Sequence, residues 1–166
     1  MAFEFRMENQ GGMQVLTMKG TIDEYADFKK IQVKSNGPLI IDLKEVTHLN
    51  SVGLRTWVTW ARTLAGHQGD IMLRNCPQVV VHQLNVLEGF APPNSVVESL
   101  EVPFFCEACE NQVLYTAQRG RDYTESKNGV PEKIQMPMKM NCKKCGEMMD
   151  ADIMPVKYFM FLKKKM

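Results

Sequence analysis

The chain has 166 residues, of which 45% are apolar and 23% charged, and its formal net charge is +1. This length suits one ordinary domain with a small second one, and this composition is that of a packed globular protein, not a disordered one. The near-zero net charge argues against nucleic-acid binding through bulk positive charge, and the lack of an apolar run of about 20 residues or a signal-peptide pattern predicts a cytoplasmic chain without a membrane span.

The first hundred residues carry alternating strand and helix patterns. An opening hairpin is predicted because two segments of alternating apolar and polar residues flank a turn at 9–12. The continuous apolar run at 38–43 is typical of a strand buried on both faces, and the segment 51–64 has apolar residues at helical spacing. The expected elements are strands at 3–7 and 13–18, a helix from 21 or 23 to about 30, a strand at 38–43, a helix at 51–64, a strand at 71–73, a helix at 77–87 and a strand at 96–97. This order predicts an α/β domain with mainly parallel strands after the hairpin.

Three segments in this order resemble the STAS family, the fold of anti-sigma factor antagonists. The first is 18–23, with the run Gly20-Thr21-Ile22-Asp23, and the second is 39–54, which ends in Asn50-Ser51-Val52-Gly53-Leu54. The third is 75–90, which starts with Asn75-Cys76-Pro77. The resemblance implies a STAS-like sheet of mixed strands with helices over residues 1–102.

The resemblance also implies a regulatory site at residue 51. In antagonists of that family a partner kinase phosphorylates the serine of an Asp-Ser-x-Gly loop, and Ser51 occupies this place, although Asn50 stands where those members carry Asp. From the residues themselves we expect Ser51 to be the N-cap of the following helix, and Gly53 to let another backbone approach closely. Val52 belongs to the same expected partner-binding loop. Trp60 is either a core residue or an anchor for the partner.

Four cysteines in the last third form two C-x-x-C pairs, Cys106 with Cys109 and Cys142 with Cys145. Two such pairs can place four thiolates around one zinc ion at about 2.3 Å, so we predict a zinc ribbon, a small β module, over residues 103–166. Four cysteine ligands leave no open position for water, which makes the expected metal structural. Rubredoxin-like iron and a redox role for either pair are the alternatives. The remaining Cys76 is expected to pack in the core.

Other features of the last third predict how the ribbon is built. Short strands are expected at 112–115 and 135–138, with a closing strand at 156–162. The polar segment 118–129 is expected to be a mobile loop that projects from the ribbon. The methionines between 136 and 154 are interpreted as packing residues in preference to a soft metal site or an adaptable binding surface.

These patterns favour a non-catalytic regulatory protein whose partner, as the resemblance implies, is a serine kinase or an anti-sigma factor. An enzyme is not expected, because the three histidines lie far apart in the order of elements and no nucleophile has an obvious base. The alternative is a nucleic-acid-binding or scaffold protein that acts through the ribbon. Its support is confined to Lys143, Lys144, Arg119 and Arg121, and the net charge weighs against it.

Overall fold

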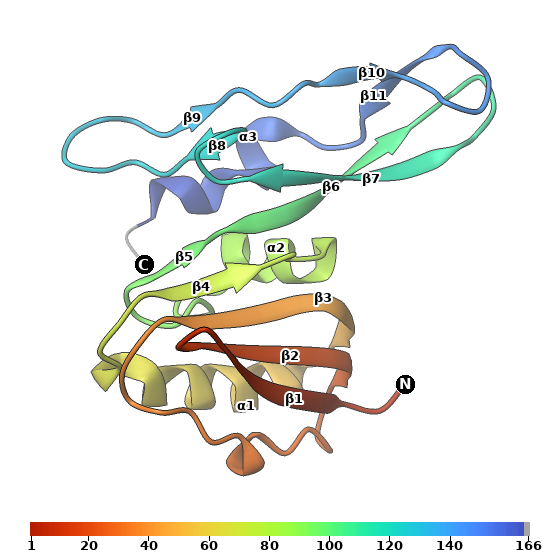
Figure 1. The fold of residues 1–166 in the computed structure, drawn as a ribbon. Coiled ribbons are helices and arrows are strands. Elements are labelled where there is room, and N and C mark those ends of the chain that lie inside the picture. Colours follow the sequence, from red (N-terminus) through yellow and green to blue (C-terminus); the bar gives the residue numbers. More distant parts are fainter. Residues whose placement is uncertain (165–166) are drawn as a thin grey trace.

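The computed structural model describes residues 1–164, and it has the α/β architecture expected from the sequence. A five-stranded mixed sheet with two helices forms the first half, and a four-stranded antiparallel sheet with a short helical segment forms the second (Figure 1). The elements of the first half are β1 (Glu4–Gln10), β2 (Met13–Ile22), the 3-10 helix η1 (Phe28–Lys30), β3 (Leu39–Leu49), α1 (Ser51–Arg62), the 3-10 helix η2 (Thr63–Gly66), β4 (Ile71–Arg74), α2 (Gln78–Val86) and β5 (Ser95–Val97). Within the described residues no helix is both long and apolar enough to cross a membrane.

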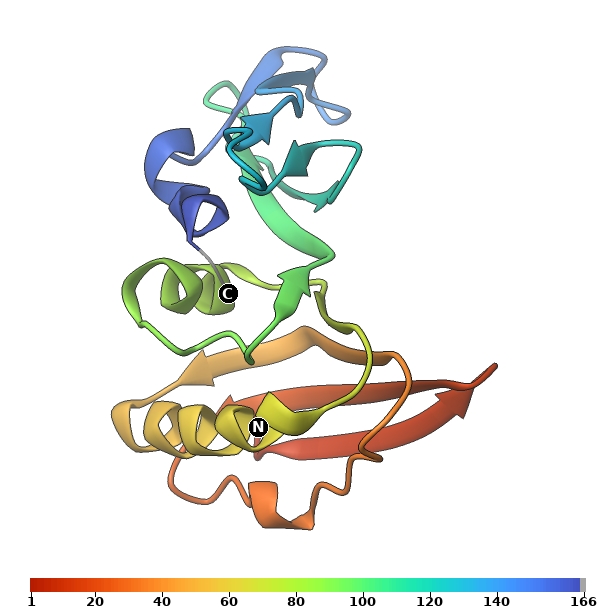
Figure 2. The ribbon, with the colours of Figure 1, turned by 90° about the vertical axis from the view of Figure 1, so that its left-hand side faces the viewer.

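The five-stranded sheet has the order β1-β2-β3-β4-β5. The strands β1 and β2 form the predicted antiparallel hairpin, and all later neighbours pair in parallel. Each crossover from β3 to β4 and from β4 to β5 carries one helix and steps in the same direction across the sheet. Because such crossovers are right-handed, α1 and α2 lie on one face of the sheet, as both views show (Figures 1 and 2).

The core of the first half lies between this sheet face and α1. The apolar stripe predicted on the helix faces this core: Trp57, Ala61 and Leu64 are buried, and Leu54 and Val58 are half-buried. The Trp57 side chain is fully enclosed and its ring stacks on Phe90 at 5.1 Å. Its indole N–H donates to the Phe90 carbonyl at 2.7 Å, which satisfies the one polar atom of this large side chain. The central strand contributes Leu39 and Ile41, both fully buried, as expected for a strand covered on this face.

The helix predicted from 21 or 23 to about 30 is wrong. The segment between β2 and β3 is an irregular loop that contains only the 3-10 helix η1. Asp23 accepts from the Tyr25 N–H at 3.0 Å and Asp27 accepts from the Lys29 N–H at 3.1 Å. These turns, in which an aspartate bonds the backbone two residues on, compete with helical hydrogen bonding, so the segment crosses the outer side of α1 without a helix of its own.

The second half grows directly out of the first. Its elements are β6 (Ser99–Phe105), β7 (Gln112–Gln118), β8 (Tyr123–Thr124), β9 (Lys133–Ile134), β10 (Lys139–Asn141), β11 (Met148–Ala151), α3 (Pro155–Tyr158) and the 3-10 helix η3 (Met160–Lys163). One residue, Glu98, separates β5 from β6, and the antiparallel sheet has the order β10-β11-β6-β7. The boundary expected after residue 102 falls inside β6, and buried side chains of both halves belong to one continuous core.

Residues 155–163 are helical where a closing strand at 156–162 was predicted. The apolar run that suggested a strand includes Phe159, Phe161 and Leu162, but these three side chains are buried in a helical segment that packs against α2. The side chain of Asn85 on α2 donates to the Tyr158 carbonyl at 2.9 Å and accepts from the Phe161 N–H at 2.8 Å. The tertiary contact with α2 therefore decides the conformation of this segment.

One smaller expectation for the ribbon is also wrong, and another holds only in part. The strand predicted at 135–138 is irregular, and the short strands β9 and β10 flank it. The first part of the segment 118–129 is folded against the protein, because Tyr123 is 1% exposed and its hydroxyl donates to the Val97 carbonyl at 2.7 Å, whereas residues 127–129 lie in the exposed turn that joins β8 to β9. The buried Asp122 accepts from the Gln118 N–H at 2.8 Å, which closes the turn after β7.

Candidate functional site

The four cysteines of the two C-x-x-C pairs lie at the tips of two hairpins. Residues 106–111 join β6 to β7, and residues 142–147 join β10 to β11. In each turn the first cysteine N–H donates to a carbonyl five residues on, from Cys106 to Asn111 at 2.9 Å and from Cys142 to Glu147 at 2.7 Å. The fifth residue of each turn has a positive φ, +59° at Glu110 and +81° at Gly146. The two tips therefore share one backbone geometry, although only the second has the glycine that favours it.

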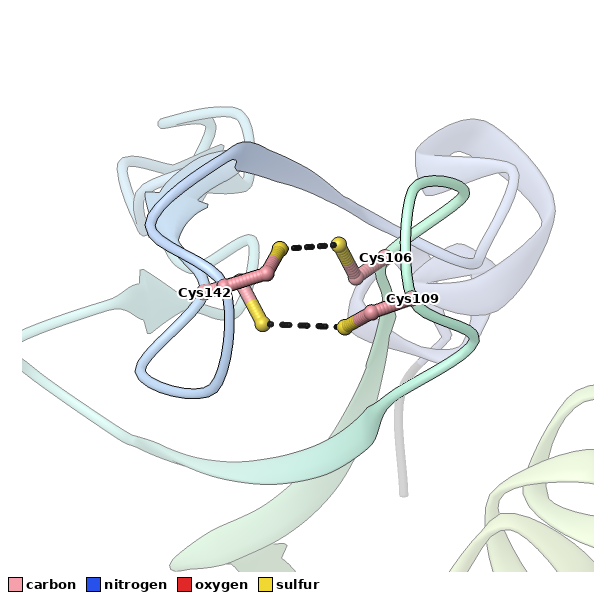
Figure 3. Close-up of side chains that lie close together, drawn as sticks. Cys106, Cys109 and Cys142 are labelled. Carbon is pink, nitrogen blue, oxygen red and sulfur yellow. Dashed lines mark hydrogen bonds between the residues drawn. The ribbon is translucent and has the colours of Figure 1, made fainter.

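The two tips face each other and bring the four thiols together (Figure 3). All four Sγ atoms lie within 4.8 Å of one another, and the Cys106–Cys145 and Cys109–Cys142 pairs are 3.5 and 3.6 Å apart. Sulfur atoms at about 2.3 Å from one tetrahedral ion are about 3.8 Å from each other, whereas disulfide sulfurs are about 2.05 Å apart. The spacing fits a shared metal ion and excludes a disulfide in this arrangement.

The electrostatics of the cluster also suit a cation. N–H donors of Cys145 and Lys144 and the Asn111 amide lower the pKa of the Cys142 thiol to about 6. At Cys145 the Glu147 N–H lowers the pKa, but partial desolvation and the neighbouring thiols outweigh it and raise the value to about 12. Four thiolates so close together repel one another unless a positive ion lies among them. The arrangement can therefore hold one metal ion with four sulfur ligands, and this set leaves no ligand position for a substrate.

The structure also bears on the fifth cysteine, Cys76, and on the redox alternative for the two C-x-x-C pairs. Cys76 is fully buried, and burial raises the pKa of its thiol, so it packs in the core as predicted. Neither C-x-x-C pair begins a helix, which is where the reactive thiol of a redox motif usually lies.

The predicted loop at residues 50–53 lies at the start of α1, but its capping residue differs from the prediction. Asn50, not Ser51, is the N-cap, because its Oδ1 accepts from the Gly53 N–H at 2.8 Å. The amide nitrogen of Asn50 also donates to the Glu24 carboxylate at 2.8 Å. Ser51 is the first helical residue, and its side chain is exposed.

The remaining residues of the expected partner surface divide into buried and exposed ones. Gly53 does allow a close backbone approach, but the approaching backbone is that of Ile22, since an added Cβ would lie 2.0 Å from the Ile22 oxygen. Trp60 is 7% exposed and packs on Phe28 and Trp57, which agrees with the core interpretation. Val52 is 49% exposed.

Sequence reasoning missed one prominent residue near this loop. Tyr25 is 85% exposed and follows Glu24, the partner of Asn50. The expected helix over 21–30 hid it, although the closely spaced Asp23 and Asp27 are a signal for turns that would have left Tyr25 on a loop.

The basic residues proposed for nucleic-acid binding do not form one free patch. Arg119 pairs with Glu125 and Arg121 pairs with Asp122, while Lys143 and Lys144 are exposed at the tip of the second hairpin. Charge already paired within the protein contributes little to phosphate binding, which weakens this alternative.

Comparison with known proteins adds no assignment. No protein-family model matches the chain, and no curated protein matches it significantly. The resemblance of the first half to the STAS family therefore stays a prediction, and the functional argument depends on the geometry.

Proposed function

We propose that this chain is a non-catalytic regulatory protein with a STAS-like first half, which docks a partner protein around residues 50–53, and with a structural zinc ribbon as its second half. The observation that carries this proposal is the exposed Ser51 and Val52 on the first turn of a firmly anchored helix. The anchoring comes from the Asn50 cap and from the contact between Gly53 and the Ile22 backbone. A rigid element that exposes a hydroxyl and an apolar side chain is well suited to recognition.

The docking surface extends beyond the helix to the loop after β2. Tyr25 and Val52 supply exposed apolar area, and the hydrogen bond from Asn50 to Glu24 joins the two segments. Tyrosine is enriched among the residues that dominate binding energy at interfaces, so Tyr25 is the proposed anchor.

Phosphorylation of Ser51 would change the charge of this surface strongly. A phosphate adds about −1.5 to −2 charges at pH 7, and the N-terminal end of α1 favours a negative group at this position. The Glu24 carboxylate lies next to Asn50 and would oppose it. By the resemblance, the partner is a serine kinase or an anti-sigma factor whose docking depends on this charge.

Zinc is the proposed metal because four cysteines in two hairpin turns form a closed site of the structural zinc type. Elemental analysis of purified protein should give one zinc per chain, and a Cys109→Ser variant should lose it. Stoichiometric iron would select the rubredoxin-like alternative, and protein without any metal would contradict the ribbon.

The docking proposal is tested with tagged protein and two matched surface variants, Val52→Asp and Val86→Asp. Both valines are exposed, but Val86 ends α2 and lies outside the proposed surface. A partner that binds the unmodified chain and Val86→Asp, but binds Val52→Asp at least about tenfold more weakly, supports the proposal. Equal binding by the two variants contradicts it.

Phosphorylation is tested separately. Incubation of the protein with the captured partner and ATP, followed by mass spectrometry, should find phosphate on residue 51 and none in Ser51→Ala. A partner that binds normally while residue 51 stays unmodified would retain docking and remove the switch.

A further inference from the structure

The irregular segment after β2 leaves a groove along the outer side of α1. This groove has a volume of about 980 Å³, within the range of small-molecule sites, and it follows α1 from Arg55 to Gly66 at the end of η2. At 1.5 Å per residue this length is roughly 17 Å. Figure 2 shows the segment that carries η1 running beside α1, and contacts between η1 and α1 place the two together.

The floor of the groove is apolar. Phe28 and Ile31 come from the loop, and Trp60 and Leu64 come from α1 and η2. All four are buried but reach the groove with part of their surface. A ligand that covered them would remove this residual apolar surface from water.

The helical wall of the groove is less polar than its sequence suggests. Three threonines line it, and each hydroxyl donates to a carbonyl of the preceding turn: Thr56 to Val52 at 3.1 Å, Thr59 to Arg55 at 2.9 Å and Thr63 to Trp60 at 2.6 Å. Because these hydrogens are already used, the wall has no hydroxyl donor left for a ligand. The body of a matching ligand is therefore apolar along most of its length.

The rim of the groove supplies positive charge. Of its two carboxylates, Asp27 forms an ion pair with Lys30 at 3.6 Å, whereas Glu24 accepts a hydrogen bond from the neutral Asn50 amide and keeps its negative charge. The two cations on the rim, Lys29 and Arg55, form no ion pair with any residue in the range 1–164. An anionic head group is the complement of this rim.

We propose that the groove between α1 and the segment 24–35 binds a free long-chain carboxylate, with its alkyl chain on Trp60 and Phe28 and its carboxylate at Arg55 or Lys29. An apolar floor, a wall without free hydroxyl donors and a rim with two unpaired cations against one unpaired carboxylate together define this ligand class. The inference does not depend on Ser51, on docking at residues 50–53 or on the metal.

The experiment uses the full metal-loaded chain and isothermal titration with dodecanoate below its micellar concentration. Dodecanoate should bind one per chain, acetate should not bind at the same concentration, and dodecanol should bind more weakly because it lacks the charge. Binding of dodecanoate with no saturable one-to-one step, or equal binding of dodecanol, overturns the proposal.

Two arginines on α1 provide a matched pair of variants. Arg55 lines the groove, whereas Arg62 is exposed on the same helix and does not. Arg55→Glu should weaken dodecanoate binding by about tenfold or more, because it removes an attraction and adds a repulsion, and Arg62→Glu should leave it unchanged. Equal effects of the two variants would show only general attraction between charges and would overturn the site.

A membrane or protein occupant would be recognised in the same set of measurements. Binding to phosphatidylglycerol vesicles without one-to-one binding of dodecanoate would identify a lipid surface and overturn the proposal. Loss of partner binding in Arg55→Glu, with no dodecanoate binding by the unmodified chain, would identify a protein-docking groove and also overturn it.

Discussion

The start of α1 packs so closely on the end of β2 that only glycine fits at position 53. A Cβ added to Gly53 would lie 2.0 Å from the Ile22 oxygen, 2.4 Å from the Ile22 carbonyl carbon and 2.7 Å from the Asp23 nitrogen. All three atoms belong to the backbone, so no side chain can turn away to make room. A Gly53→Ala change must therefore move the first turn of α1 away from β2.

The size of the effect follows from two opposing contributions. Overpacking of this kind costs about 1–3 kcal/mol, and alanine recovers up to about 1 kcal/mol through its higher helix propensity. Because the overlap is with backbone, the net loss is expected near about 2 kcal/mol, which lowers Tm by about 4–8 °C in a chain of this size.

Gly66→Ala is the matched control, since a Cβ there meets nothing within 4 Å and the residue has no positive φ. It should leave the stability unchanged or raise it by up to about 1 kcal/mol. Thermal and urea denaturation, followed by circular dichroism, measure both variants. A Gly53→Ala protein as stable as the unmodified chain, or an equal loss in Gly66→Ala, would refute this account of the packing.

Three further predictions concern the second half. Chelation of the metal should unfold the ribbon, because structural zinc contributes about 10–16 kcal/mol in small domains and a whole domain has only about 5–15 kcal/mol of net stability. The expected result is a loss of near-ultraviolet circular dichroism on chelation that added zinc restores. An unchanged spectrum after complete metal removal contradicts this prediction. Asn85→Ala should destabilise the chain by about 1–3 kcal/mol and speed amide exchange at 158–162, since it removes both side-chain hydrogen bonds from Asn85 to this segment. His82 is exposed on the same helix, and His82→Ala should do neither. Equal exchange rates in the two variants would count against the contact. The Nε of Arg119 lies 2.8 and 3.0 Å from the two Glu125 carboxylate oxygens, and these hydrogen bonds hold the pKa of the Glu125 carboxyl below its ordinary value. The ionised Glu125 therefore stabilises the fold above its unfolded pKa of about 4.3, and this stabilisation is lost as the pH falls through the lower folded pKa. Glu125→Gln should therefore flatten the acid side of a stability–pH curve from urea melts, and a curve identical to that of the unmodified chain would exclude this linkage.

The elements that could be predicted from the sequence are those with a strong local pattern. The hairpin has alternating residues and a glycine turn, the strand β3 begins as a continuous apolar run, and α1 carries an apolar stripe at helical spacing. The four candidate metal ligands were predictable for a related reason. The C-x-x-C spacing forms each half of the site within one turn, so the fold has only to bring two turns together.

Other features depended on contacts between distant segments. The side chain of Asn50 became the cap because it can reach both the Gly53 N–H and the Glu24 carboxylate, and this left Ser51 exposed as the first helical residue. The groove along α1 exists because the segment after β2 formed aspartate turns in place of a helix.

By itself the sequence determined where short-range chemistry is strong: the hairpin, the buried strand, the helix that begins at residue 51 and the two cysteine turns. Only the tertiary structure decided that residues 155–163 are helical, because their short apolar run fits a strand equally well until Asn85 of α2 supplies both a donor and an acceptor. The tertiary structure likewise decided that the two halves share one core, since β6 continues from β5 and the C-terminal segment covers α2. The physical reason is the same in both cases: residues with weak local preference adopt the conformation that buries apolar surface and satisfies backbone hydrogen bonds against distant partners.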